Sequence, residues 1–269
     1  MINEHPNAYI GITDFEDKSQ VEAMLAVFRE ASSGRFVRKL GVGVMMSRKT
    51  LNDLPSKFSQ VFPNKERIAE IFSTDSSAYN ILHYADYAGI DVLKNLTEAV
   101  KWGGPNLHAI QLDMVWPETE VIRQFKELYP QIQLIIQINS SALEKIVYKI
   151  FVLITCLDQY SPFLDGVLLD MSMGRGLPMS WLDLLPYLAA INAFLPDLEL
   201  VVAGGLGPNS LELVKPLVDC FVPEISIDAQ GQLRPSGSAL EPVDWQMARN
   251  YLAGAVKIFN HRWHRISSR

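Results

Sequence analysis

Short, unbroken apolar runs alternate along this chain with longer segments whose apolar residues recur every three or four positions. Unbroken apolar runs are typical of parallel strands buried on both faces, whereas the longer period indicates amphipathic helices. The predicted strands cover residues 8–14, 40–46, 79–84, 107–115, 132–138, 165–170, 198–203 and 221–227. The predicted helices cover residues 19–31, 51–61, 91–102, 117–129, 142–157, 181–194, 209–218 and 243–259, with a further helical turn or two within 63–77.

Eight strand–helix units in 269 residues match the length of a (βα)8 barrel, a fold of about 250 residues. Alternation of this kind predicts an α/β fold with a parallel sheet, and the number of units favours a closed barrel over an open sheet. No linker or low-complexity run interrupts the pattern, so we expect residues 1–269 to form a single TIM-barrel domain.

Composition narrows the choice of partners. The chain is 48% hydrophobic, as expected for a globular core, and its net charge of −6 argues against nucleic acid as the main partner. Two cysteines, Cys156 and Cys220, are too few for a disulfide framework. The longest apolar stretch is too short to cross a bilayer, so we expect a cytoplasmic protein without a membrane partner. No cofactor motif is present, and the oligomeric state is left open.

A glycine-rich turn follows the seventh predicted strand. The segment LVVAGGLGPN, residues 200–209, is an apolar strand followed by Gly204, Gly205 and Gly207, and then by a proline suited to the start of a helix. Free backbone N–H groups at such a position bind anions, usually phosphate. The eighth strand leads into a second turn at Ala229, Gln230 and Gly231. Phosphate held between the loops after strands seven and eight is common in this fold, so both turns are predicted to bind phosphate.

Acidic residues lie at the expected carboxyl ends of several strands, where barrel active sites are built. Asp14, Asp113, Asp170 and Asp228 end predicted strands, and Asp86 follows the third. A single aspartate at such a position is as easily a strand terminator or helix cap, but several on one rim can form an acid–base site. Two arginines complete the candidate set for substrate binding: Arg48 after the second strand and Arg175 in the loop after the sixth.

Two histidines leave a metal site open as an alternative. His83 lies inside the third predicted strand and His108 at the start of the fourth, with Asp86 and Asp113 near them in the sequence. Imidazole and carboxylate ligands of this kind hold metals in sugar-phosphate epimerases. His108, however, falls near the opposite end of its strand, so the leading prediction contains no metal.

Five short segments resemble the phosphoribosylanthranilate isomerase family, in the order in which that family has them. They are residues 9–13 (YIGIT), 109–113 (AIQLD), 166–170 (GVLLD), 202–209 (VAGGLGPN) and 226–231 (SIDAQG). The resemblance implies a barrel that binds a phosphorylated aminoaldose, with Asp170 as general base and Arg48 at the substrate carboxylate. The family's acid is a first-strand cysteine, and Ile10 stands in its place. Asp113 likewise replaces a histidine of the family pattern.

The sequence therefore predicts an isomerase-like barrel that binds a phosphorylated small molecule. Asp170, Asp14 and Asp113 are the predicted catalytic residues, and Arg48, Arg175 and Asp228 the predicted substrate contacts. Two alternatives remain: a protein that binds a phosphorylated metabolite without turning it over, and a metal-dependent sugar-phosphate epimerase or aldolase. Binding is better supported than turnover, because Ile10 cannot transfer a proton.

Overall fold

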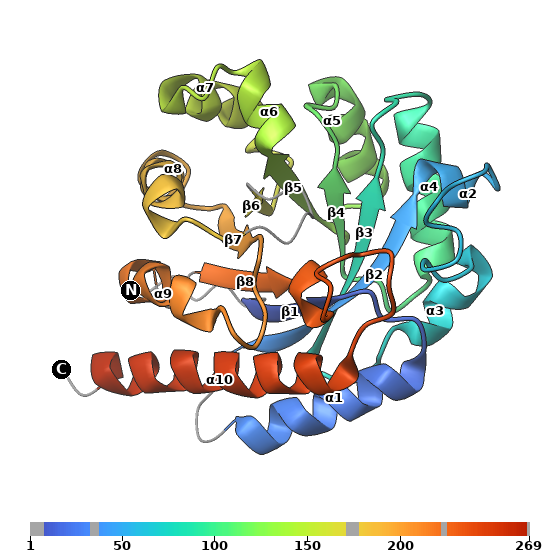
Figure 1. The fold of residues 1–269 in the computed structure, drawn as a ribbon. Helices are drawn as coiled ribbons and strands as arrows, with labels where there is room; N and C mark the ends of the chain where they lie inside the picture. Colours follow the sequence, from blue (N-terminus) through green and yellow to red (C-terminus); the bar gives the residue numbers. More distant parts are fainter. Residues whose placement is uncertain (1–7, 33–37, 171–177, 222–224, 268–269) are drawn as a thin grey trace.

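Eight parallel strands close into a barrel in the computed structural model, which describes residues 8–32, 38–170, 178–221 and 225–267 (Figure 1). Each strand pairs with its neighbours in sequence order, and β1 closes the barrel against β8. The strands are β1 Tyr9–Thr13, β2 Lys39–Ser47, β3 Ala78–Ala85, β4 Ala109–Asp113, β5 Gln133–Asn139, β6 Gly166–Asp170, β7 Glu199–Ala203 and β8 Ile225–Ala229. The predicted single (βα)8 barrel is confirmed.

Ten α-helices surround the described strands, and short 3-10 turns precede or join some of them. The helices are α1 Lys18–Ala31, α2 Arg48–Leu51, α3 Ile68–Ile71, α4 Val92–Gly103, α5 Thr119–Leu128, α6 Ser140–Lys145, α7 Ile150–Tyr160, α8 Trp181–Phe194, α9 Lys215–Phe221 and α10 Trp245–Ser267. The 3-10 turns are η1 Lys65–Arg67, η2 Leu211–Leu213 and η3 Gly231–Leu233. The first and last helices lie side by side and cover the closure of the barrel (Figure 1). No helix in the described ranges is long and apolar enough to cross a membrane.

Side chains alternate between the inside and the outside of the barrel, because successive strand residues point to opposite faces. One cluster fills the inside and contains Tyr9, Tyr79, Ile81, Ala109, Ile135, Leu168 and Val201. A larger cluster lies between the strands and the helices and includes Ile10 and Ile12. On β1, therefore, Gly11 and Thr13 face inward, whereas the isoleucines between them face the helices.

The helix predicted at residues 51–61 is wrong. The structure ends α2 at Leu51, and Asp53 adopts a left-handed backbone with φ of 53°. Pro55 follows two residues later, and the residue before a proline avoids the helical region. The segment that follows is irregular, and Pro55 and Phe58 line the large pocket described below.

The long helix predicted at residues 142–157 is two helices, α6 and α7. Val147 and Tyr148 both have φ of 54° in the junction, which no α-helix can accommodate. The helix predicted at residues 209–218 is also wrong at its start. The hydroxyl of Ser210 accepts a hydrogen bond from the Gly207 N–H at 2.8 Å and holds a tight turn, and the α-helix begins only at Lys215.

The eighth strand lies further along the chain than the predicted 221–227. Phe221 is the last residue of α9, and β8 is Ile225–Ala229. An apolar run that continues from a helix into a strand gives no periodicity signal for the boundary between them. The shift places Asp228 and Ala229 inside the strand, so that Asp228 faces the inside of the barrel while Ala229 packs against the outer core.

Candidate functional site

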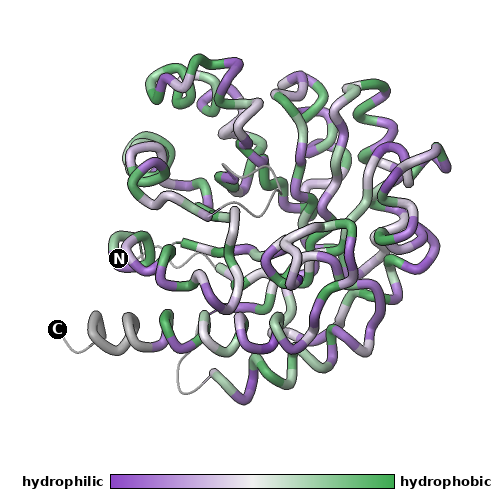
Figure 2. Tube along the Cα trace, viewed as in Figure 1, coloured by the Kyte–Doolittle hydropathy of each residue, from purple (hydrophilic) through white to green (hydrophobic). Residues whose placement is uncertain are grey.

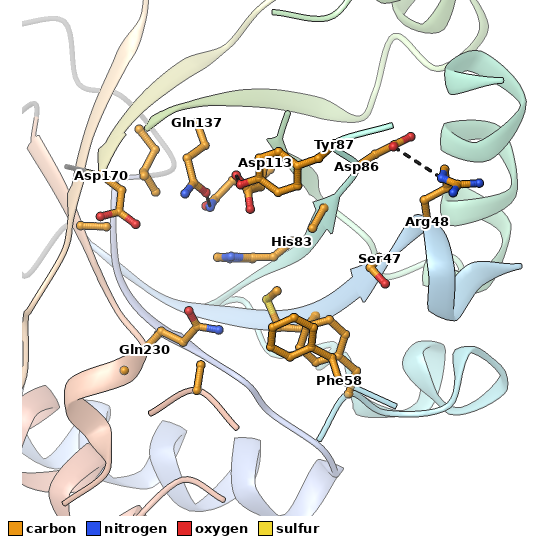
Figure 3. A pocket seen from close by; sticks show the side chains of 18 of the residues that line it. Ser47, Arg48, Phe58, His83, Asp86, Tyr87, Asp113, Gln137, Asp170 and Gln230 are labelled. Atoms are coloured by element: carbon orange, nitrogen blue, oxygen red, sulfur yellow. Dashed lines mark hydrogen bonds and ion pairs between the residues drawn. The ribbon is translucent and has the colours of Figure 1, made fainter. Parts of the chain in front are cut away.

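A cavity of about 1020 Å³ opens at the carboxyl ends of the strands (Figure 3). Residues at or just beyond the ends of β2 through β8 line it, together with the irregular segment after α2. This is the end of the barrel at which enzymes of this fold bind their substrates. Of the carboxylates predicted at the strand ends, Asp113, Asp170 and Asp228 line the cavity, and Asp86 joins them from the loop after β3.

Asp228 lies at the bottom of the cavity, beside β1. Gly11 is its register partner on β1, and a Cβ at Gly11 would lie 2.1 Å from the Asp228 Oδ1 atom. The Thr13 hydroxyl donates a hydrogen bond of 2.9 Å to Oδ2. Burial raises the pKa of Asp228 to about 7, and the charges of Asp14 and Asp170 contribute in the same direction. The carboxyl group therefore holds a proton for much of the time near neutral pH.

His83 lines the middle of the cavity and lies close to Thr13, with 3.4 Å between its Nε2 atom and the Thr13 hydroxyl oxygen. Burial lowers the pKa of His83 to about 3, so the ring is neutral at physiological pH. Among the predicted metal ligands, His108 is far from this site. Its Nδ1 atom accepts a hydrogen bond from the Asn80 N–H, and its ring stacks on Tyr79 below the floor.

Asp113 ends β4 and is held by two neighbours. The Tyr87 hydroxyl donates a hydrogen bond of 2.5 Å to its Oδ1 atom, and the Asn139 amide donates one of 3.1 Å to the same atom. Burial raises the pKa of Asp113, the two hydrogen bonds oppose that effect, and the charge of Asp170 adds to it. Asp170 itself projects into the cavity from the end of β6 beside Gln137 (Figure 3).

Two glutamines of the cavity were missed by the sequence reasoning. The Gln111 amide donates a hydrogen bond of 2.8 Å to Gln137 Oε1, which leaves Gln111 Oε1 buried and without a hydrogen-bond partner in the described structure. Gln111 on β4 and Gln137 on β5 point to the inside of the barrel, on the same face of their strands as the inner apolar cluster. A polar residue at an inward position of an otherwise apolar strand is the signal that could have found them.

Positive charge gathers on the wall formed by the segment that follows β2. Arg48, Lys49 and Lys57 line the cavity there, and Arg48 Nε lies 3.7 Å from Asp86 Oδ1. Figure 3 shows the Arg48–Asp86 pair on the opposite side of the cavity from Asp170 and Gln230. The stacked rings of Phe58 and Phe62, with centroids 4.9 Å apart, add an apolar surface to the same wall.

The two turns that are predicted to bind phosphate lie on the side of the cavity opposite the basic wall. Gly204 and Gly205 line it in left-handed conformations, with φ of 106° and 66°, and Gln230 and Gly231 line it from the turn after β8. Within the described part of the chain, the N–H groups of Gly204, Gly205 and Gly231 donate no hydrogen bond. Gly207 differs, because its N–H is satisfied by Ser210 and it is not part of the lining. Ala229 is not part of it either.

Asp14 is placed away from the cavity. Its carboxylate is buried and paired with Arg234, whose Nη2 atom lies 2.5 Å from Oδ2, and Gln230 donates a further hydrogen bond of 3.2 Å. Burial raises the pKa of Asp14, and the guanidinium opposes this. The structure thus gives Asp14 a role in holding the turn after β8. Arg175, the remaining predicted contact, lies outside the described residues.

Ile10, at the position of the family's acid, is fully buried among the apolar residues between the sheet and the helices. Its side chain is therefore separated from the cavity by the strand itself. Among the described residues, no group of three His, Cys, Asp or Glu side chains is arranged to hold a metal ion.

Neither the family models nor the curated proteins contain a sequence match to this chain. The fold is similar to solved barrels. N-(5'-phosphoribosyl)anthranilate isomerase from Pyrococcus furiosus superposes with a TM-score of 0.57 at 14% identity, covering 95% of this chain and 100% of that one. Tryptophan synthase subunit alpha from Legionella pneumophila gives 0.56 at 10% identity, covering 95% and 93%. A chitinase catalytic domain from Pyrococcus furiosus gives 0.57 at 8%, covering 94% and 96%. These likenesses show the TIM-barrel fold.

Proposed function

We propose that this barrel binds a phosphorylated small molecule in the cavity at the carboxyl ends of its strands. The observation that carries the proposal is a set of three glycines, Gly204, Gly205 and Gly231, that line the cavity and whose N–H groups have no acceptor in the described chain. Consecutive N–H groups in a turn with left-handed residues form a concave anion site. A phosphate there would place the rest of the ligand between Asp170 and the basic wall at Arg48.

We further propose that the barrel is an isomerase that moves a proton next to a carbonyl or imine, with Asp170 as the base. The acid cannot come from Ile10, which faces the helices, or from Asp14, which is committed to Arg234. Asp228 fits the role, because its carboxyl lies above Gly11 in the cavity and has a pKa of about 7. A carboxyl group that keeps its proton near neutral pH can act as a general acid.

Calorimetric titration with inorganic phosphate and with ribose 5-phosphate tests the binding proposal. We expect both to bind, and Gly205→Ala to weaken binding about tenfold or more, because an alanine at φ of 66° distorts the turn. Gly89→Ala is the matched control: Gly89 has φ of 64°, but nothing lies within 4 Å of the added Cβ and it does not line the cavity. Equal binding by the two variants, or no binding by the parent protein, would contradict the proposal.

Complementation of a strain that lacks phosphoribosylanthranilate isomerase tests the narrow form of the isomerase proposal. We expect growth with the parent chain and none with Asp170→Asn, and a weaker effect of Asp228→Asn that changes with pH. Ligand binding without growth or turnover would favour the alternative of a non-catalytic phosphometabolite-binding protein. In that protein the missing acid at position 10 would be the reason for the loss of activity.

A further inference from the structure

The sides of the cavity differ in charge. Among the described residues of its lining, the basic side chains all come from the segment after β2 and form the basic wall. The carboxyl ends of β4, β5 and β6 instead present carboxylates and amides, and Figure 2 shows hydrophilic positions in purple among the green ones of β4 and β5. We call this part of the lining the acidic side, and it consists of Gln111, Asp113, Gln137 and Asp170. Figure 3 shows Asp113, Gln137 and Asp170 next to one another and away from Arg48.

Asp113 is held in such a way that one of its carboxylate oxygens stays open. Its hydrogen bonds from the Tyr87 hydroxyl and the Asn139 amide both end on Oδ1, and Oδ2 accepts none from the described residues. Asn139 is itself fixed, because its Oδ1 atom accepts a hydrogen bond of 3.0 Å from the Ala142 N–H at the start of α6. Burial raises the pKa of Asp113, and the charge of Asp170 adds to this, whereas no described cation lowers it. A ligand cation beside Asp113 would therefore stabilise its carboxylate.

Gln111 supplies a second acceptor on the same strand. It is 3% exposed, and its Oε1 atom is buried without a hydrogen-bond partner in the described structure. The orientation of its amide is fixed, because Nε2 donates a hydrogen bond of 2.8 Å to Gln137 Oε1. Gln111 precedes Asp113 by two residues on β4, so both side chains point inward, about 7 Å apart along the strand. Buried polar atoms without partners are few in native proteins, and one in the lining of a cavity indicates a ligand group that donates a hydrogen bond.

We propose that the acidic side binds a protonated amine, and that the ligand is a phosphorylated amine such as an amino sugar phosphate. This inference rests on the proposed binding of phosphate at the glycine turns. An ammonium group carries three N–H donors and no acceptor, which suits the open oxygen of Asp113 and the Oε1 atom of Gln111. The basic wall repels such a group, so charge favours one orientation of the ligand in the cavity. A metal ion fits less well, because no group of three His, Cys, Asp or Glu side chains in the described chain is arranged to hold one.

Calorimetric titration with glucosamine 6-phosphate and glucose 6-phosphate tests the proposal, because these ligands differ only in an amino group that replaces a hydroxyl. At a pH at which the amine is protonated, we expect glucosamine 6-phosphate to bind about tenfold more tightly or better, the usual value of a hydrogen bond to a charged group. Equal affinities would overturn the amine proposal and leave the phosphate proposal standing. Glucosamine that binds as tightly as its phosphate ester would contradict the phosphate proposal alone, and no binding of any of these sugars would contradict both.

Asp113→Asn tests the residue that carries the proposal. Asparagine keeps the shape of the side chain and an oxygen that can accept from Tyr87, but it has no charge. We expect the affinity for glucosamine 6-phosphate to fall much further than that for glucose 6-phosphate, so that the preference is lost. Asp91→Asn is the matched control, because Asp91 is exposed in the loop after β3, does not line the cavity and has φ of 52°, which asparagine also tolerates. A preference as strong in Asp113→Asn as in Asp91→Asn would overturn the assignment.

Gln111→Leu gives a second test that changes no charge. Leucine has a similar volume and removes the buried oxygen that lacks a partner, so the variant should unfold at about the same urea concentration as the parent chain or a higher one. It also removes an acceptor for the amine, and we expect the preference for glucosamine 6-phosphate to fall severalfold. A folded variant that keeps the full preference of the parent would show that the amine does not bind beside Gln111, and would overturn that part of the site.

Discussion

The buried ion pair of Arg234 and Asp14 should contribute strongly to stability, and Arg234→Met tests this. The guanidinium is 2% exposed and uses all three of its nitrogens. It bonds the Asp14 carboxylate, the Gln230 carbonyl at 2.9 Å and the Glu241 carbonyl at 2.5 Å. Methionine fills most of the volume but pairs with none of these groups. The buried Asp14 carboxylate then keeps only the hydrogen bond of 3.2 Å from the Gln230 amide and has no cation beside it.

The expected cost follows from these contacts. Breaking a buried ion pair by removing one partner costs about 3–5 kcal/mol, because the remaining charge is buried without compensation. An unfolding entropy of about 2.1 cal/mol/K per residue implies a decrease in Tm of roughly 2 °C per kcal/mol for a chain of 269 residues. We therefore expect Arg234→Met to lower Tm by about 5–10 °C.

Circular dichroism during thermal and urea unfolding measures the effect, with Arg249→Met as the control. Arg249 also loses an ion pair, at 3.5 Å to Glu30, but its side chain is 52% exposed. Exposed pairs contribute about 0–1 kcal/mol, so the control should lose little stability. An Arg234→Met variant no less stable than Arg249→Met would refute the assignment of Asp14 to a structural role.

The pH dependence of the Arg234→Met effect has a definite sign. Burial already raises the pKa of Asp14, and loss of the guanidinium that opposes this should raise it further. At a pH below the folded-state pKa the carboxyl is neutral and no longer needs a cation. The difference in stability between variant and parent should therefore be largest at neutral pH and shrink as the pH falls. A difference that grows on acidification would contradict the reasoning.

Three further variants have equally specific outcomes. In urea unfolding, Glu199→Gln should stabilise the protein by roughly 1–3 kcal/mol at about pH 8 and little at about pH 5. Burial raises the pKa of Glu199 to about 7, so the parent protein loses stability as the pH rises from the pKa of the unfolded state toward that of the folded state. A gain at about pH 5 and none at about pH 8 would contradict this. Gly11→Ala should destabilise the barrel by about 1–3 kcal/mol, because the Cβ of the new alanine would overlap the Asp228 carboxyl. An unchanged urea midpoint would show instead that the Asp228 side chain moves aside without cost. Tyr87→Phe should raise the pKa of Asp113, followed by 13C NMR of the carboxyl carbons, because a hydrogen bond that lowers it is lost.

Most of the barrel could be predicted from sequence, because strands buried on both faces are unbroken apolar runs such as residues 165–170. The predicted element boundaries were wrong where the end of a helix or the start of a strand is not marked by a change in the apolar pattern. Left-handed residues, including Asp53, Val147 and Tyr148, ended helices whose apolar pattern continued. At Phe221 a helix and a strand share one apolar stretch, and no local signal separates them.

Parts of the candidate site could also be predicted. Asp113 and Asp170 were located because both end apolar strands, and their placement on the cavity follows from the fold. The fate of Asp14 could not be predicted, because its partner Arg234 lies 220 residues away and ion pairs at that separation leave no local trace. Whether Ile10 points into the barrel or toward the helices depends on which residues of β1 face inward. A shift of one residue reverses the answer, and a strand that is apolar throughout does not indicate which arrangement occurs.

Closure of the barrel between β1 and β8 has a consequence for the order in which the protein assembles. The Tyr9 N–H to Ser226, the Thr13 hydroxyl to Asp228 and the Asp14 carboxylate to Arg234 are bonds across 215–220 residues. Contacts of such high sequence separation are formed late, since their loop-closure entropy must be overcome first. During synthesis the β8-facing edge of β1 therefore stays unpaired, and Asp14 stays without Arg234, until the last strand emerges. That interval is when the chain is most prone to aggregate.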